Sequence, residues 1–221
     1  LPPWDNPSGS GVTPDYFNAC AAPNAGCQWV DVPDNFAGTI PAFDGDGYPG
    51  IIGYYTSCPN CREYIQAPLT QALVAGQKYT LSMRVRLGDQ SNYAIDRMGM
   101  HVSVLPPSQP GNQPINTVVP QLEDTLGIGN TNTWVLLSTD YVAAGGEAWI
   151  TIGNFRDNAM LNIVNLGTST STCALASNGA YYLIDSVNIF PVLNVINYVN
   201  TCFGDSTLFS VIQSPNLIAT S

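Results

Sequence analysis

The strictest pattern in the chain is the alternation of side chains between residues 77 and 88. Five apolar side chains at odd positions alternate with five polar or basic side chains at even positions. A period of two places successive side chains on opposite faces of a β-strand, so one face of this strand must be covered by a second layer. The apolar set is Tyr79, Leu81, Met83, Val85 and Leu87, and the polar set is Lys78, Thr80, Ser82, Arg84 and Arg86.

A second strand pattern follows the glycine pair at 145–146 and runs to Phe155. Ala148, Ile150 and Ile152 fall on one face, while Trp149 and Thr151 fall on the other. A strand that is apolar on both faces is typical of a central strand in an antiparallel sandwich. Further strands are predicted at 28–32, 51–55, 98–105, 115–119, 133–138 and 180–190, with loops at 1–27 and 156–179.

These patterns predict an all-β fold, an antiparallel β-sandwich. The 221 residues suffice for one large sandwich, and Pro191 is its expected end. We therefore divide the chain into a sandwich at 1–191, a linker at 192–200 and the start of a second β-domain at 201–221.

The composition restricts the partners of this chain. Hydrophobic residues make up 45 % of it, which is enough for a core, whereas charged residues make up only 10 %. The net charge of −10 excludes a nucleic-acid partner, which needs a basic surface, and argues against an anionic membrane surface. A surface of Asn, Gln, Ser, Thr and Gly is common in extracellular modules.

Six cysteines, an even number, also favour an oxidising, extracellular compartment. Local disulfides are expected between Cys20 and Cys27 and between Cys58 and Cys61. A redox role for the second pair would need a βαβ pattern around it, and a zinc site would need a second pair of ligands at similar spacing. Neither is present in the sequence.

Two acidic features suggest structural calcium. Asp44 and Asp46 alternate with glycines, which gives hard oxygen ligands on a backbone that can curl around a cation, although an ordinary turn has the same composition. Asp185 shares a predicted core face with Leu183 and Val187, and a carboxylate there needs either hydrogen bonds or a cation. Calcium at Asp44, Asp46 and Asp185 is the prediction, and turn structure with hydrogen bonding is the alternative.

Catalytic signatures are sparse. The chain has one histidine, His101, and no Gly-x-Ser-x-Gly segment for a nucleophilic serine. Glycosidases use two carboxylates at a set separation, but the only glutamates are Glu63, Glu123 and Glu147. We expect Glu63 and Glu147 to pair across strands with Arg84 or Arg86. The sequence therefore predicts a protein that is not an enzyme.

Ligand binding would use aromatic faces beside polar groups. Each aromatic candidate is more often a core residue than a binding surface, and the simpler interpretation of the arginines is a solvated face paired with carboxylates. The sharper alternative for the arginines is a basic patch for an acidic sugar or a partner segment. The candidate ligand-binding residues are Trp4, Trp29, Tyr54, Tyr55, Trp149, Arg84 and Arg86.

An ordered set of motifs resembles a known family. It comprises Pro2-Pro3-Trp4, Thr13-Pro14-Asp15-Tyr16-Phe17-Asn18-x-Cys20, Val32-Pro33-x-Asn35-Phe36-x-Gly38, Gly47-Tyr48-x-Gly50, Arg62-Glu63-Tyr64-Ile65-Gln66, Gly146-Glu147-x-x-Ile150-Thr151-Ile152-Gly153-Asn154-Phe155 and Tyr181-Tyr182-x-Ile184-Asp185-x-Val187. Together they resemble the N-terminal β-sandwich modules of large Bacteroidota surface proteins, which are exported by type IX secretion and often carry gliding-motility-type C-terminal domains. Residues 199–206 resemble the opening strand of the PKD or Ig-like repeats that follow such modules.

The resemblance implies a jelly roll like that of carbohydrate-binding modules, with a structural calcium that Asp185 would join. It implies a secreted or cell-surface, non-catalytic binding or adhesion module whose partner is an extracellular glycan or surface polymer, or neighbouring copies. The family's usual first strand is not in this chain. That departure suggests a partner for Cys173 in the missing strand, while Cys202 would pair within the following repeat. Separately, Asp124-Thr125-Leu126 resembles the short O-glycosylation sites of these bacteria, which suggests a glycosylation site at Thr125.

Two other functions stay open. One is a structural stalk or filament subunit assembled by strand donation, and the other is an accessory module of a secreted hydrolase. A binding module should expose aromatic side chains side by side, whereas a filament subunit should leave an open sheet edge.

Overall fold

The computed structural model describes residues 4–8, 13–22, 24–167, 169 and 171–192. The predicted linker after Val192, the predicted second domain at 201–221 and Cys202 lie outside the described residues. Among the described residues, no helix has both the length and the apolar character needed to cross a membrane.

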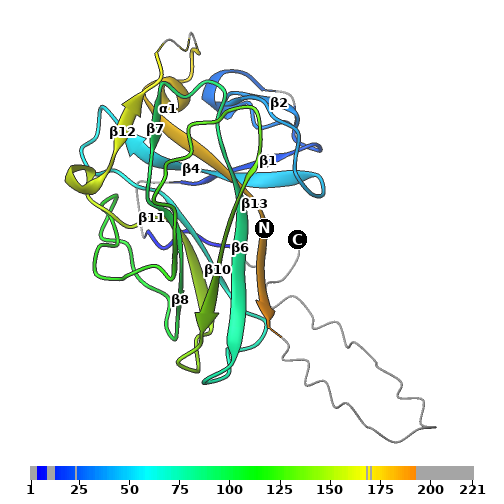
Figure 1. Cartoon of the computed structure of the whole chain (residues 1–221). Helices are drawn as coiled ribbons and strands as arrows, with labels where there is room; N and C mark the ends of the chain where they lie inside the picture. Colours follow the sequence, from blue (N-terminus) through cyan, green and yellow to red (C-terminus); the bar gives the residue numbers. More distant parts are fainter. Residues whose placement is uncertain (1–3, 9–12, 23, 168, 170, 193–221) are drawn as a thin grey trace, which may run out of the picture.

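Two antiparallel sheets form the molecule, as the sequence predicted (Figure 1). The larger sheet has the order β1 (Asp15–Asn18), β4 (Gly47–Tyr55), β13 (Gly179–Pro191), β6 (Lys78–Leu87) and β10 (Val135–Val142). The smaller sheet has the order β5 (Tyr64–Pro68), β11 (Trp149–Asn154), β8 (Met98–Ser103) and β9 (Leu122–Glu123). The fold is therefore an antiparallel, jelly-roll β-sandwich.

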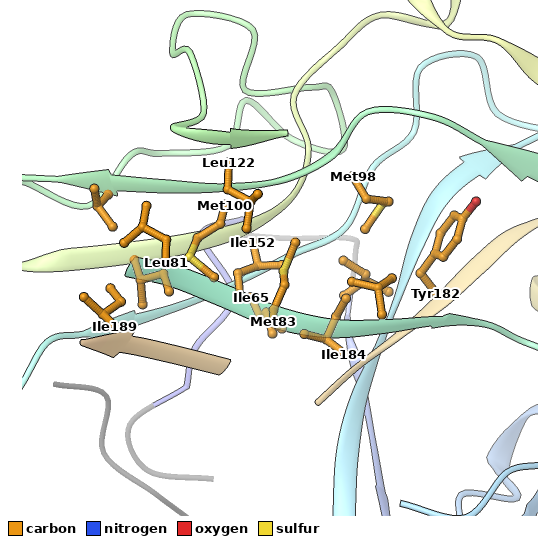
Figure 2. Packing of buried hydrophobic residues seen from close by; sticks show 14 of the residues in the cluster. Ile65, Leu81, Met83, Met98, Met100, Leu122, Ile152, Tyr182, Ile184 and Ile189 are labelled. Atoms are coloured by element: carbon orange, nitrogen blue, oxygen red, sulfur yellow. The ribbon is translucent and has the colours of Figure 1, made fainter. Parts of the chain in front are cut away.

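The main core fills the space between the two sheets. The alternating apolar face of β6 points into it, and Leu81, Met83 and Val85 are fully buried. Figure 2 shows Ile152 of β11 and Met100 of β8 meeting this face from the opposite sheet. β11 lies between β5 and β8, so its prediction as a central strand is confirmed.

A second apolar cluster covers the other face of β4 and β13. Its aromatic centre is Phe17, Phe36, Tyr48 and Tyr181, with ring centroids 5.2–6.3 Å apart. Because both faces of β13 are covered, Tyr181 to Ile184 are all buried. Smaller elements complete the chain: β2 (Asp34–Asn35), β3 (Gly38–Thr39), β7 (Tyr93–Ile95), β12 (Ile163–Asn165), η1 (Gly26–Gln28), η2 (Asn158–Met160) and α1 (Ala174–Ser177).

A bulge in β13 follows Asp185 and corrects the prediction that Asp185 shares one face with both Leu183 and Ile189. The register with β6 shifts between Asp185 and Asn188, and Ser186 has a φ of 44°. The extra residue reverses the alternation, so Ile184 and Ile189 both point into the main core although their positions differ in parity. Asp185 therefore shares the face of Leu183, as predicted, and lies on the opposite face from Ile189.

Several short elements differ from the sequence prediction. The predicted strands at 28–32 and 115–119 are absent from the described structure, whereas Asp15–Asn18, expected in a loop, forms strand β1. The predicted loop at 156–179 contains β12 and α1. These segments span only a few residues, so pairing with a distant strand decides their structure rather than their own periodicity.

The disulfides differ from prediction in one of two cases. Cys58 is bonded to Cys61 as expected. Cys27, however, is bonded to Cys173 and not to Cys20, which is a free, exposed thiol. The bond lies at the second apolar cluster, where the fold brings the partly buried Cys27 next to the buried Cys173 across a sequence separation of 146. The predictions of a Cys20–Cys27 bond and of a partner for Cys173 in a missing first strand are therefore wrong.

Candidate ligand-binding site

A pocket of about 210 Å³ opens where the edges of the two sheets meet. The larger sheet contributes residues of β1 and β4, and the smaller sheet contributes β5 together with the N-terminal segment that pairs with it. The lining residues are Trp4, Asp5, Asn6, Pro14, Asp15, Tyr16, Pro49 and Ile65.

Backbone pairing fixes both walls of this pocket. On one side, Asp5 and Gln66 exchange two backbone hydrogen bonds of 2.7 and 2.8 Å, which hold the N-terminal segment against β5. Trp4 packs against the main core from that segment. On the other side, β1 pairs with β4 so that Tyr16 lies opposite Pro49.

The pocket combines aromatic and polar groups. Trp4 and Tyr16 supply the aromatic surface, and the Tyr16 side chain keeps 36 % of its surface exposed. Asp5, Asn6 and Asp15 supply hydrogen-bonding groups. None of the lining residues is basic. The site therefore suits a neutral polar ligand with an apolar face, and it repels an anion.

The buried side chain of Tyr181 fixes the position of the Asp15 carboxylate. The Tyr181 hydroxyl donates a 2.6 Å hydrogen bond to Asp15 Oδ2. A Cβ atom at Gly50 would lie 2.5 Å from the hydroxyl oxygen, so glycine at that position makes the contact possible. Burial raises the pKa of Asp15 above its usual range, and this hydrogen bond offsets part of the rise.

A second carboxyl group lies behind the pocket. Glu63 is buried, and its Oε2 accepts a 2.8 Å hydrogen bond from the backbone N–H of Ile52. Burial raises the pKa of Glu63 to about 8, and the charge of Asp15 adds to the rise. Burial also raises the pKa of Tyr181, with Asp15 and Glu63 as further causes. Two buried groups with raised pKa values, Glu63 and Tyr181, therefore lie near Asp15.

The other predicted ligand-binding aromatic residues do not join Trp4. Tyr54 packs on the main core, 5.5 Å from the ring of Tyr93, while Tyr55 packs on the second cluster. Trp29 follows η1 and is 37 % exposed, and Trp149 lies half-buried on β11. Tyr16 was missed because its segment is too short to show a strand period; an aromatic pair, Tyr16-Phe17, is the only signal the sequence offers there.

The predicted basic patch is engaged within the protein. Arg86 is buried and pairs with Asp89 at 2.9 Å, and Arg84 lies 4.4 Å over the ring of Phe43. Lys78 pairs with Asp140 at 2.7 Å. The outer face of β6 is therefore largely neutralised by internal partners, and it offers an acidic sugar little free charge.

Glu63 and Glu147 do not pair with Arg84 or Arg86, which corrects that prediction. Glu63 accepts a backbone N–H instead. Glu147 accepts hydrogen bonds from the Tyr141 hydroxyl at 2.6 Å and from the backbone N–H groups of Ala144 and Gly145. Burial would raise the pKa of Glu147, but these hydrogen bonds outweigh it and lower the pKa. Glu147 thus fixes the glycine turn before β11.

The three aspartates proposed for calcium do not form a cluster of metal ligands in the structure. Asp185 uses both oxygens on backbone N–H groups: Oδ2 accepts from Phe43 and Asp44, and Oδ1 accepts from Ser186. No group of three or more His, Cys, Asp or Glu suited to a metal occurs among the described residues. Asp185 is therefore satisfied by hydrogen bonds, which is the alternative that the sequence left open, and calcium at Asp44, Asp46 and Asp185 stays a prediction.

Two further features lie outside the pocket. A second, polar cavity of about 440 Å³ is lined mainly by amide and hydroxyl side chains of the loops around Asn92 and Ser169, which largely bond to one another. Thr125 is exposed beside Leu126, whose backbone N–H bonds to Asp124 Oδ1. Its glycosylation, and the prediction that the chain is not an enzyme, stay predictions.

Comparison with known proteins gives no family for the chain. No protein-family model and no curated protein matches it. Among solved structures, the CBM22-1 xylan-binding domain of Paenibacillus barcinonensis Xyn10C is 15 % identical with a TM-score of 0.43, covering 86 % of this chain and 85 % of that one. The K1 cleaved adhesin domain of Lys-gingipain from Porphyromonas gingivalis W83 is 14 % identical with a TM-score of 0.43, covering 86 % and 91 %.

Proposed function

We propose that this chain is a non-catalytic glycan-binding module and that the pocket between the sheet edges is its sugar site. The observation that carries the proposal is the pairing of Trp4 and Tyr16 with the polar groups of Asp5, Asn6 and Asp15 in one pocket. Sugar rings have an apolar face that packs on an aromatic ring and a rim of hydroxyl groups that need hydrogen-bond partners.

The size and charge of the pocket restrict the class of ligand that it can bind. Its 210 Å³ is below the range of about 300–1,000 Å³ for typical small-molecule sites. We infer that it accepts one sugar unit or a chain end, with the rest of the glycan in solvent. Because Asp5 and Asp15 line it and no basic residue does, neutral or amino sugars are the expected ligands, and uronic or sialic acids are not.

Binding to an array of neutral, basic and acidic glycans tests the proposal. Wild-type protein should bind neutral or amino sugars, and Trp4→Ala should weaken that binding at least tenfold, because a buried aromatic contact at a site centre contributes about 2 kcal/mol or more. Tyr16→Ala should act similarly.

Trp29→Ala is the matched control, since it removes an equally large, 37 % exposed side chain outside the pocket. It should leave the affinity unchanged. The absence of any glycan ligand, or Trp4→Ala binding as tightly as wild type with its melting temperature intact, would refute the sugar site.

A further inference from the structure

Strand β10 forms the far edge of the larger sheet. It pairs with β6 along its whole length, from Val135 opposite Val85 to Val142 opposite Lys78. In the described part of the chain, no strand pairs with its other side. An edge of eight residues presents a row of unpaired backbone N–H and C=O groups, which makes it a template for another strand.

The usual protections of a sheet edge are missing from β10. Its sequence, VLLSTDYV, has no proline and no lysine, and its register with β6 is unbroken. Its one charge, Asp140, is engaged by Lys78 at 2.7 Å and by the Thr80 hydroxyl at 3.0 Å. The edge is therefore long, free of bulges and close to neutral despite the net charge of −10.

Apolar side chains occur on both faces of this edge. On the outer face, Leu136 is 51 % exposed and Val142 is 59 % exposed. On the inner face, Val135, Leu137 and Tyr141 pack on the main core but stay only partly buried. A strand added beside β10 would cover both sets.

The other sheet edges are less open. β5 is already paired with Asp5, β9 has only two residues, and β1 has four. β10 is therefore the one long, unprotected edge among the described strands.

We propose that β10 pairs antiparallel with β10 of a second copy around a two-fold axis at Thr139. This register places Leu136 opposite Val142 of the other copy, so that the exposed apolar side chains meet in pairs. It places Asp140 opposite Ser138. An axis at Asp140 would set two carboxylates against each other, and an axis at Ser138 would set Leu136 against Asp140.

The two larger sheets then become one continuous sheet across the axis. The pocket lies at β1, the opposite end of the same sheet, so the dimer carries two pockets at its outer ends. The rest of each copy is acidic, and its repulsion is screened by salt, so dimerisation should strengthen as salt concentration rises.

Sedimentation velocity over a concentration series tests the association. Wild-type protein should show a monomer–dimer equilibrium, and Leu136→Lys should raise the dissociation constant at least tenfold. Val164→Lys, which places the same charge at an exposed position of β12, should leave it unchanged. A wild-type protein that stays monomeric at every concentration overturns the proposal, and so does a dimer that Leu136→Lys does not weaken.

Cysteine pairing tests the register. In a Cys20→Ser background, which removes the free exposed thiol, Leu136→Cys and Val142→Cys protein are oxidised separately and as a mixture. Only the mixture should give abundant cross-linked dimer, because residues directly opposite on antiparallel strands lie at about 4.5–5.5 Å between Cα atoms, within disulfide range. Equal cross-linking by Leu136→Cys alone, or none in the mixture, overturns this register. If another segment of the same chain covers β10, the mixture will not cross-link.

Discussion

Replacing Cys27 and Cys173 together by alanine is expected to lower the free energy of unfolding by about 3–5 kcal/mol. The bond joins residues 146 positions apart, and closing so long a loop removes much of the conformational entropy of the unfolded chain. Cys173 also lies buried in the second apolar cluster, so its removal leaves a small packing defect there. Equilibrium unfolding in guanidinium chloride measures the difference.

The Cys58–Cys61 bond supplies the matched control. It closes a loop with a sequence separation of only 3, so its double serine variant should cost about 2 kcal/mol or less by the same loop-entropy argument. Cys20→Ser belongs in every variant, since a free thiol can exchange with the remaining bond. Equal losses for the two bonds, or a loss below about 1 kcal/mol for the long one, would contradict the entropic account.

The two strands with the clearest sequence signal are also the ones the structure confirms most fully. β6 and β11 each carry a period-two pattern over six or more residues, and that pattern predicts which face of each strand is buried. The face of Ile189 could not be predicted in this way, because a single inserted residue at Ser186 reverses the alternation after Asp185. Nothing in the local sequence marks that insertion.

The candidate site was predictable only in part, since its residues come from four separated segments. Trp4 was one of five aromatic candidates in the sequence, and only the pairing of Asp5 with Gln66 places it in a pocket. The partner of Cys27 is likewise 146 residues away, where spacing carries no information. Glu63 appeared to be a cross-strand partner for an arginine, because a sequence does not reveal which carboxylates are buried.

Burial makes Glu63 the residue with the largest expected effect on the pH dependence of stability. Its pKa is raised from 4.5 to about 8 in the folded protein, so the folded state holds this proton more tightly than the unfolded chain does. The stabilisation is complete below about pH 4.5 and is lost as the pH rises to about 8. The shift is about 3.5 pKa units, and at about 1.4 kcal/mol per unit the full loss is on the order of 5 kcal/mol.

Other groups set the limits of this pH window. Burial also raises the pKa values of Asp15 and Asp185, so their contributions fall with rising pH in the same sense. The pKa values of Glu147 and Asp140 are lowered, and stability from these two groups is lost only as the pH falls through their folded-state values. Burial lowers the pKa of His101, whose contribution therefore grows with rising pH, but the large shift of Glu63 still predicts a net decline in stability from about pH 5 toward pH 8.

Glu63→Gln should remove most of that decline. The amide is uncharged at every pH and keeps an oxygen that accepts the N–H of Ile52, so the variant has no carboxylate to ionise in the core. Melting temperatures measured from pH 5 to pH 8 should fall steeply for wild type and only slightly for the variant, with the residual slope due to Asp15 and Asp185.

Glu123→Gln is the control, because it makes the same substitution in a half-buried ion pair with Arg97 and Arg156. This control should lower the melting temperature slightly at all pH values and leave the slope of melting temperature against pH as in wild type. If Glu63→Gln also kept the wild-type slope, Glu63 would ionise normally in the folded protein.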